Sequence, residues 1–186
     1  LKLKQKHVIS LETRLTNYEG TGEITIRDLV RNSLRMRPDR IIVGEVRGKE
    51  SSDMLQAMNT GHNGSLTTMH ANSPIDALNR LETMILMAGM EIPIPAIREY
   101  IENAIDIVVQ TSRLSDGRRK ITSICEIIGF KDDMIEVKEI FGFNQTGITE
   151  NGEVIGEFKK HKYIPKVYKK LKSRGITNLE DIFKEG

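Results

Sequence analysis

The side chains best placed to do chemistry come directly after short apolar runs. Glu45 follows the run Ile41–Gly44, with Arg40 before it and Arg47 after it. In nucleotide-hydrolysing α/β domains, a carboxylate at such a strand end helps hold Mg²⁺ through water or polarises the attacking water, and a glutamate suits the second task. The alternative is an ordinary strand-end glutamate paired with a neighbouring arginine. On spacing alone, both interpretations stay open.

A second strand-like run leads to an imidazole. The run Ser65–Met69 ends at His70, with Thr68 and Asn72 beside it. Carboxyl ends of parallel strands meet at one edge of a sheet, so we expect His70 to lie at the same edge as Glu45. An imidazole there could sense or bind a phosphate, whereas the alternative is a structural histidine with satisfied hydrogen bonds.

The elements that would position these residues alternate between strand and helix. Thr25 and Asp28 have the spacing of a capping box, which predicts a helix that ends before Pro38. The predicted order is a strand at 8–13, that helix, a strand at 41–46, a helix at 52–59, a strand at 65–70 and a helix opened by Ser73-Pro74. This alternation predicts an α/β domain with a mostly parallel sheet, whose ligand sites lie outside the carboxyl ends of the strands.

From residue 105 the pattern changes. Strand-like runs at 107–111, 120–124 and 134–137 are separated by turn sequences, which predicts an antiparallel meander. The glycine-rich stretch that follows carries no predicted strand. Pro165 opens a short basic helix that Gly175 ends, and a last short helix is predicted near Leu179.

Composition excludes several classes of protein. The 186 residues are 38% hydrophobic and 29% charged with a formal net charge of +2, which are ordinary globular values that name no partner. The single cysteine, Cys125, excludes an internal disulfide framework and fits a reducing compartment, with the cytosol as the default. No run approaches the roughly 18 apolar residues of a membrane span. Because the chain begins at Leu1, we expect a piece of a longer protein.

Arginines are concentrated in one stretch. They are Arg27, Arg31, Arg35, Arg37, Arg40 and Arg47. Three interpretations compete: a solvated helix face, a phosphate-stabilising arginine that reaches an adjacent subunit, and a nucleic-acid patch. Tyr18 is the only aromatic residue before Tyr100, so base stacking is not expected. We therefore expect no nucleic-acid partner, and binding that falls steeply with salt would be the sign of one.

Several catalytic motifs are absent from the sequence. No Gly-x4-Gly-Lys-Ser/Thr loop occurs, so the chain lacks the usual grip on the β and γ phosphates of a nucleotide. The four histidines form no helical pair with an intervening acid, and no Gly-x-Ser-x-Gly elbow is present. A zinc enzyme and a serine hydrolase are therefore not expected.

The stretch Ile24–Gly48, which includes Arg35-Met36-Arg37-Pro38 and Val43-Gly44-Glu45-Val46-Arg47, closely resembles the core of the type II and type IV secretion ATPases. The stretch that runs from Gln56–His62 to Ala71–Ser73, and so includes His70, resembles the histidine box of the same family. Within that superfamily the resemblance is to the CpaF-like branch, which assembles Tad/Flp pili. It covers roughly residues 1–140 and continues more weakly beyond them.

The resemblance implies roles for four residues. The strand Ile41–Glu45 would be the Walker B strand, with Glu45 as the catalytic glutamate. His70 would be the histidine-box residue that couples the γ-phosphate to strand position. Arg47 and Arg14 would be phosphate-proximal or inter-subunit residues. No direct metal ligand is implied, and Mg²⁺ would be held through water near Glu45.

The resemblance also implies an architecture and a setting. Residues 1–141 would be the distal part of an incomplete RecA-like P-loop NTPase domain that ends in antiparallel strands, and residues 142–186 a small helical appendage. The family uses ATP and Mg²⁺ as a ring hexamer, cytoplasmic and peripheral at the inner face of the cytoplasmic membrane. It moves pilin or export substrates through a membrane platform protein.

The chain departs from the family pattern in one decisive respect. The Walker A loop, the acidic box and the amino-terminal domain do not occur in these residues. We therefore expect the intact protein to hydrolyse ATP and this piece alone to be inactive, because phosphoryl transfer needs the loop and the strand ends together. The alternative is a non-catalytic interaction module that keeps the ATPase fold.

Overall fold

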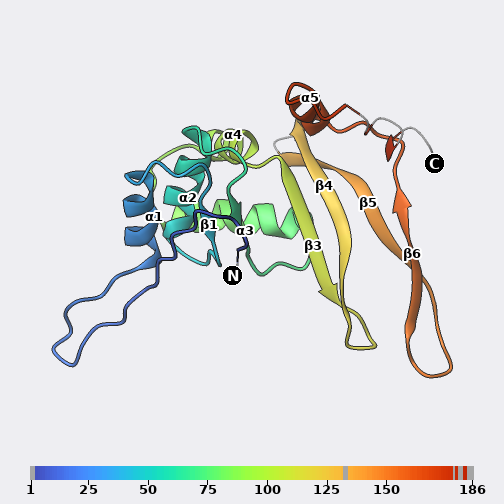
Figure 1. The fold of residues 1–186 in the computed structure, drawn as a ribbon, viewed down its shortest axis with the longest axis horizontal. Coiled ribbons are helices and arrows are strands. Elements are labelled where there is room, and N and C mark those ends of the chain that lie inside the picture. The colour runs from blue at the N-terminus through green and yellow to red at the C-terminus, as the bar shows by residue number, and fades with distance from the viewer. Residues whose placement is uncertain (1–2, 132–133, 178, 180–181, 184–186) are drawn as a thin grey trace. The chain divides into compact units, whose positions relative to one another are not determined.

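The computed structural model describes residues 3–131, 134–177, 179 and 182–183 (Figure 1). It divides into two compact units, one of Leu1–His70 with Asn79–Ala104 and the other of Ala71–Leu78 with Ile105–Gly186. The division predicted at residue 141 lies inside the strand β5 (Met134–Ile148), so the compact units do not follow it. Each unit is described separately.

The first unit is mainly helical. Its elements are α1 (Ile26–Leu34), β1 (Ile42–Val43), α2 (Glu50–Asn59), β2 (Leu66–Thr67), the later turns of α3 (Pro74–Met87), and α4 (Ile94–Ala104). The alternation of strand and helix predicted from the sequence is confirmed from residue 25 to residue 87. The buried core includes Leu55, Leu81, Ile85, Ile97 and Ile101.

Helix α1 begins as its sequence predicts. The Thr25 hydroxyl accepts a hydrogen bond from the backbone N–H of Asp28 at 3.2 Å, and the Asp28 carboxylate accepts one from the backbone N–H of Thr25 at 2.9 Å. This reciprocal pair satisfies two N–H groups that the helix itself cannot pair. The side-chain hydrogen bond from Thr25 lowers the pKa of Asp28, because it favours the charged carboxylate.

The two strands of the first unit pair in parallel over a short length. Ile42 pairs with Leu66 and Val43 with Thr67. The backbone hydrogen bond from Val46 N–H to the Thr68 carbonyl, at 2.9 Å, extends the pairing by one step beyond the named strands. The predicted parallel arrangement is therefore confirmed, and the strands are shorter than predicted.

The strand predicted at 8–13 is wrong. Residues 8–13 pair with no other backbone in the described part of the chain, and the nearest pairing is a single antiparallel bridge between Arg14 and Ile24. Val8 and Ile9 are 41% and 59% exposed. A strand-like run makes a strand only where a partner strand supplies the hydrogen bonds.

The second unit is an antiparallel sheet in the order β3-β4-β5-β6, and it confirms the predicted meander. Its strands are β3 (Ile107–Arg113), β4 (Arg119–Lys131), β5 (Met134–Ile148) and β6 (Val154–Lys160). The strand β6 was not predicted, because Gly156 resembles a loop residue. A Cβ at Gly156 would collide with the Phe143 ring, so this glycine marks a close approach between paired strands.

The helix α5 (Lys166–Lys172) follows Pro165, as predicted, and Gly175 at φ 85° lies just beyond its end. A buried carboxylate attaches this helix to the sheet. Glu126 on β4 accepts hydrogen bonds from the backbone N–H groups of Lys166 and Val167 at 2.9 and 2.8 Å, and from the Tyr163 hydroxyl at 2.5 Å. The predicted last helix near Leu179 falls largely outside the described residues.

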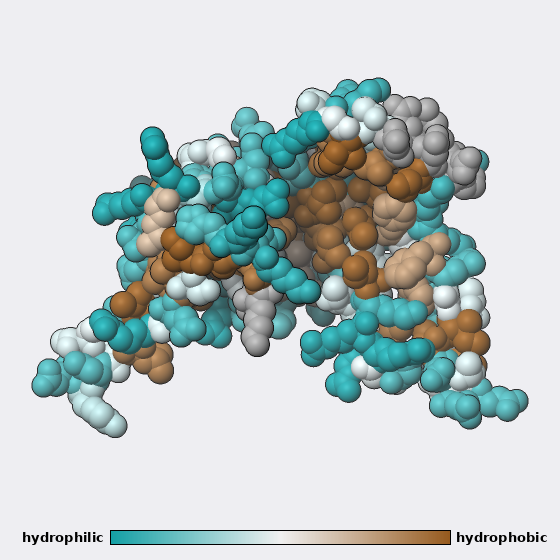
Figure 2. All heavy atoms as spheres, in the orientation of Figure 1, coloured by the Kyte–Doolittle hydropathy of each residue, from teal (hydrophilic) through white to brown (hydrophobic). Residues whose placement is uncertain are grey.

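Apolar side chains gather on the visible face of the second unit's sheet (Figure 2). Val109 and Phe158 are among the exposed apolar residues of that unit, at 50% and 60%.

None of the helices in the described part of the chain combines the length and hydropathy of a transmembrane span.

Candidate functional site

The parallel pairing brings Glu45 and His70 together. Glu45 lies two residues beyond β1 and His70 three residues beyond β2, at the carboxyl ends of both strands. The His70 Nε2 atom lies 3.6 Å from the Glu45 Oε1 atom, within the range of an ion pair when the imidazole is protonated. The His70 side chain is 87% exposed and the Glu45 side chain 41%, so both are accessible to a ligand. The prediction that Glu45 and His70 lie at one strand edge is therefore confirmed.

Thr68 fixes the backbone beneath this pair. Its hydroxyl donates to the carbonyl of Gly44 at 2.6 Å, while its carbonyl accepts from the N–H of Val46 at 2.9 Å. The backbone on either side of Glu45 is thus tied to the strand that carries His70. The alternative of Glu45 paired with a neighbouring arginine is not what the structure shows, because its partner at this edge is His70.

Arg47 lies two residues beyond Glu45 and is exposed. Its backbone N–H and that of Gly48 donate to Glu50 Oε1 at 2.7 and 3.0 Å, which holds the loop that leads into α2. No hydrogen bond or ion pair of its side chain is recorded within the described residues. Arg47 therefore follows Glu45 closely in the chain, and its guanidinium makes no hydrogen bond to another described residue.

Arg14 is engaged elsewhere. Its Nε donates to the carbonyl of Gly22 at 2.7 Å, and its backbone pairs with Ile24. Both bonds lie in the hairpin that projects from the first unit in Figure 1, with a turn at Asn17–Gly20. No contact between Arg14 and the Glu45–His70 pair is recorded in the described part of the chain.

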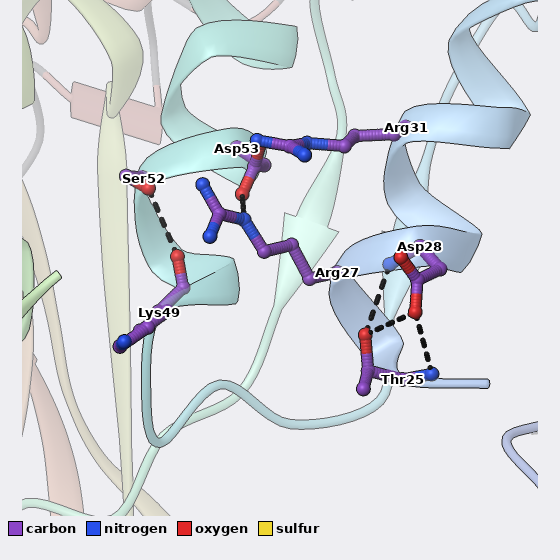
Figure 3. Close-up of polar contacts among 7 residues, drawn as sticks. All are labelled: Thr25, Arg27, Asp28, Arg31, Lys49, Ser52 and Asp53. Atoms are coloured by element: carbon purple, nitrogen blue, oxygen red, sulfur yellow. Dashed lines mark hydrogen bonds and ion pairs between the residues drawn. The ribbon is translucent and has the colours of Figure 1, made fainter. Parts of the chain in front are cut away.

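Two arginines of the arginine-rich stretch 27–47 share one buried carboxylate (Figure 3). Arg27 and Arg31 extend from α1 toward Asp53 on α2, and their Nε atoms donate to its two oxygens at 2.6 and 2.7 Å. The Asp53 side chain is 7% exposed, against 36% and 56% for the arginines. These two arginines therefore do more than form a solvated helix face, because both bind Asp53. We call this group the Arg27–Asp53–Arg31 cluster.

Asp53 is a site residue that the sequence pattern did not predict. An aspartate in the first turn of a predicted helix is explained by the helix dipole alone, so its type gave no reason to look further. The available signal was the spacing of Arg27 and Arg31, which places two cations on one helical face and requires a counter-charge wherever that face is covered.

Glu45 and His70 do not by themselves form a complete nucleotide site. Within the described ranges, no group of three or more His, Cys, Asp or Glu side chains is arranged to hold a metal ion. The Glu45 carboxylate and the His70 imidazole fit groups that act beside a water molecule or a phosphate. They do not fit a complete Mg²⁺–phosphate cradle, which uses loop amides and a lysine that these residues lack.

Comparison with known proteins places these features in a family. Residues 1–154 match the model of the type II/IV secretion system protein family. A Mycobacterium tuberculosis protein whose name refers to conjugal transfer is 42% identical over 121 residues, which is 65% of this chain and 34% of that protein. The type IV secretion system protein PtlH of Bordetella pertussis is 39% identical over 114 residues, 59% of this chain and 34% of its own.

A solved structure supports the fold. The VirB11 ATPase of the Brucella suis type IV secretion system, crystallised with sulphate, aligns with a TM-score of 0.52 and 34% identity over 55% of this chain and 32% of that chain. The chain therefore spans about a third of the length of the relatives that it matches. Its fold is part of a RecA-like α/β domain, as predicted, and the chain belongs to the type II/IV secretion system protein family.

Proposed function

We propose that this chain is the distal part of a secretion motor ATPase and that it contributes Glu45 and His70 to the nucleotide site. The observation that carries the proposal is the approach of these two side chains, 3.6 Å apart, at the carboxyl ends of paired parallel strands. Ligands of open α/β sheets bind at that edge. Family membership supports the same role.

Each residue has a defined task in this proposal. The Glu45 carboxylate orients and polarises the attacking water as a general base. The His70 imidazole, exposed beside it, contacts the terminal phosphate, and the Thr68 bonds to Gly44 and Val46 transmit a shift of one strand to the other. Arg47, close by in the chain, supplies positive charge. Mg²⁺, held through water near Glu45, would neutralise charge on the phosphates when ATP is bound.

The proposal also covers the rest of the protein, its assembly and its place in the cell. The phosphate-binding loop lies in another part of the protein, so the chain alone does not turn over ATP. The intact protein is of the CpaF-like type and acts as a cytoplasmic hexamer, peripheral at the inner face of the cytoplasmic membrane, that moves pilin or another substrate through a membrane platform protein. Arg14 is a phosphate-proximal or inter-subunit residue, and residues 142–186 are the appendage to the domain. We propose no nucleic-acid partner.

A second candidate is a non-catalytic interaction module that keeps the ATPase fold. The absence of a Gly-Lys-Ser/Thr sequence from these residues favours it. Under that proposal Glu45 and His70 form an ordinary surface ion pair, which contributes about 0–1 kcal/mol to stability and nothing to turnover.

Replacement of Glu45 separates the two candidates. In the full-length protein, Glu45→Gln should lower ATP turnover by about 100-fold or more while nucleotide binding, measured by equilibrium titration, changes little. Glu19→Gln, at an exposed position in the hairpin, is the matched control and should leave turnover unchanged. Equal turnover in Glu45→Gln and wild type would reject the catalytic role.

A further inference from the structure

A second polar site lies in the first unit beside the Arg27–Asp53–Arg31 cluster. It is an open hollow of about 260 Å³. Its lining comes from α1, α2, α4 and the loop before α4, and consists of Arg27, Arg31, Ser52, Asp53, Gln56 and Tyr100, with Met90 as an apolar wall. Neither Glu45 nor His70 contributes to it, so the proposed nucleotide role leaves this hollow unexplained.

The charges that line the hollow do not cancel. Two guanidinium groups face a single carboxylate, so the lining carries a surplus of one positive charge. Each Asp53 oxygen is already occupied by one Nε donor, at 2.6 and 2.7 Å. The aspartate is 7% exposed, so the hollow presents its arginines, rather than its carboxylate, to the solvent.

Hydrogen-bond donors remain available. Both arginines bind Asp53 through Nε, and no partner for their terminal Nη groups is recorded among the described residues. Figure 3 shows the bond from Arg27 to Asp53 running through Nε. Tyr100 also lines the hollow, and its phenol hydroxyl is a hydrogen-bond donor. The exposed Gln56 amide adds further donors, whereas the Ser52 hydroxyl already donates to the Lys49 carbonyl at 2.9 Å.

We propose that this hollow binds a phosphate-sized oxyanion through the Nη groups of Arg27 and Arg31. A planar guanidinium presents parallel N–H donors that match two oxygens of a phosphate or carboxylate, and charge-assisted bonds of this kind are stronger than neutral ones. Asp53 holds both arginines in place before the anion arrives, which reduces the entropic cost of binding. The anion is a free phosphate, the phosphate of a nucleotide or a carboxylate.

Calorimetric titration of the whole chain with inorganic phosphate at low salt tests this inference. Wild type should bind saturably, Arg31→Gln should weaken binding about tenfold, and Arg31→Lys should lie between them because it keeps the charge and loses the planar fork. Arg35→Gln is the matched control, since Arg35 is exposed, ends the same helix and does not line the hollow; its affinity should stay within about twofold of wild type. No saturable binding, or an equal loss in Arg35→Gln, would overturn the inference.

Parallel titrations identify the source of the anion. ADP and acetate are titrated beside phosphate, and the one whose affinity falls most in Arg31→Gln belongs to the hollow. Glu45→Gln and His70→Ala should leave phosphate binding unchanged. If they abolish it, the phosphate binds at the strand edge and the inference fails while the proposed function stands. If circular dichroism shows that Arg31→Gln does not fold, Gln56→Ala and Tyr100→Phe replace it, each with an expected loss of about threefold; no loss in either would reject the site.

Discussion

The interactions that stabilise the first compact unit differ from those that stabilise the second. The second unit has strands of 7, 13, 15 and 7 residues, joined by antiparallel ladders that bulges interrupt. The strands of the first unit have two residues each, and its helices pack around Leu55, Leu81 and Ile85 with a charged cluster beside them. The unit with little backbone pairing is the one whose strand ends expose Glu45 and His70. This contrast suggests that substitutions in the second unit affect mainly stability, and those at the strand ends of the first affect mainly chemistry.

Removal of the buried carboxylate in the second unit should have the largest effect on stability. Glu126 is 2% exposed and accepts three hydrogen bonds, so Glu126→Ala leaves two N–H groups of α5 and one hydroxyl without their acceptor. We expect a loss of about 3 kcal/mol in the free energy of unfolding, measured by urea denaturation. Hydrogen exchange should accelerate at Lys166 and Val167.

The same experiment tests the contrast between the units. Glu136→Ala, at an exposed position on β5, is the control and should change stability by less than about 0.5 kcal/mol. In Glu126→Ala the amides of α1 and α2 should exchange at the wild-type rate under native conditions. Equal acceleration in both units would show that they open together.

An intermediate effect is expected for the charged cluster of the first unit. Asp53→Asn removes the counter-charge of Arg27 and Arg31, which are 36% and 56% exposed and can turn to water. The loss should therefore be about 1.5 kcal/mol, below that for a fully buried pair. Hydrogen exchange should accelerate in α1 and not in β3–β6. Asp39→Asn, an exposed aspartate after the same helix, is the control, and an unchanged α1 in Asp53→Asn would contradict the role of the cluster.

The smallest effect concerns the turn between β3 and β4 and depends on pH. Hydrogen bonds from the Arg118 side chain and the Val154 backbone lower the pKa of Asp116 from 3.8 to about 2. Because the pKa is lowered in the folded state, this carboxylate stabilises the fold above about pH 4, and the contribution is lost as the pH falls toward 2. Asp116→Asn should melt below wild type at pH 7, and the two melting temperatures should converge near pH 2. A constant difference across this range would reject the assignment.

Local signals in the sequence predicted local structure well. The Thr25–Asp28 capping box and the Pro165 start of α5 depend on neighbours within a few residues, and both are present. The meeting of Glu45 and His70 was also predictable, because parallel pairing of two apolar runs leaves few arrangements for their ends.

Features that depend on distant partners were not predictable in this way. The strand predicted at 8–13 has a strand-like composition but no partner among the described residues. Gly156 in β6 resembled a loop residue because its purpose, the close approach of Phe143, lies on another strand. Asp53 lies 22 and 26 residues from the arginines that it binds.

Single-turnover ATP hydrolysis by the full-length protein tests the central claim most directly, through a double-mutant cycle on Glu45 and His70. The variants are Glu45→Asp, His70→Ala and the double substitution. If the two side chains act as one unit at the strand edge, the double variant should be at most about threefold slower than the slower single variant. A double variant whose rate loss equals the product of the two single losses, or single variants that hydrolyse ATP at the wild-type rate, would contradict the account.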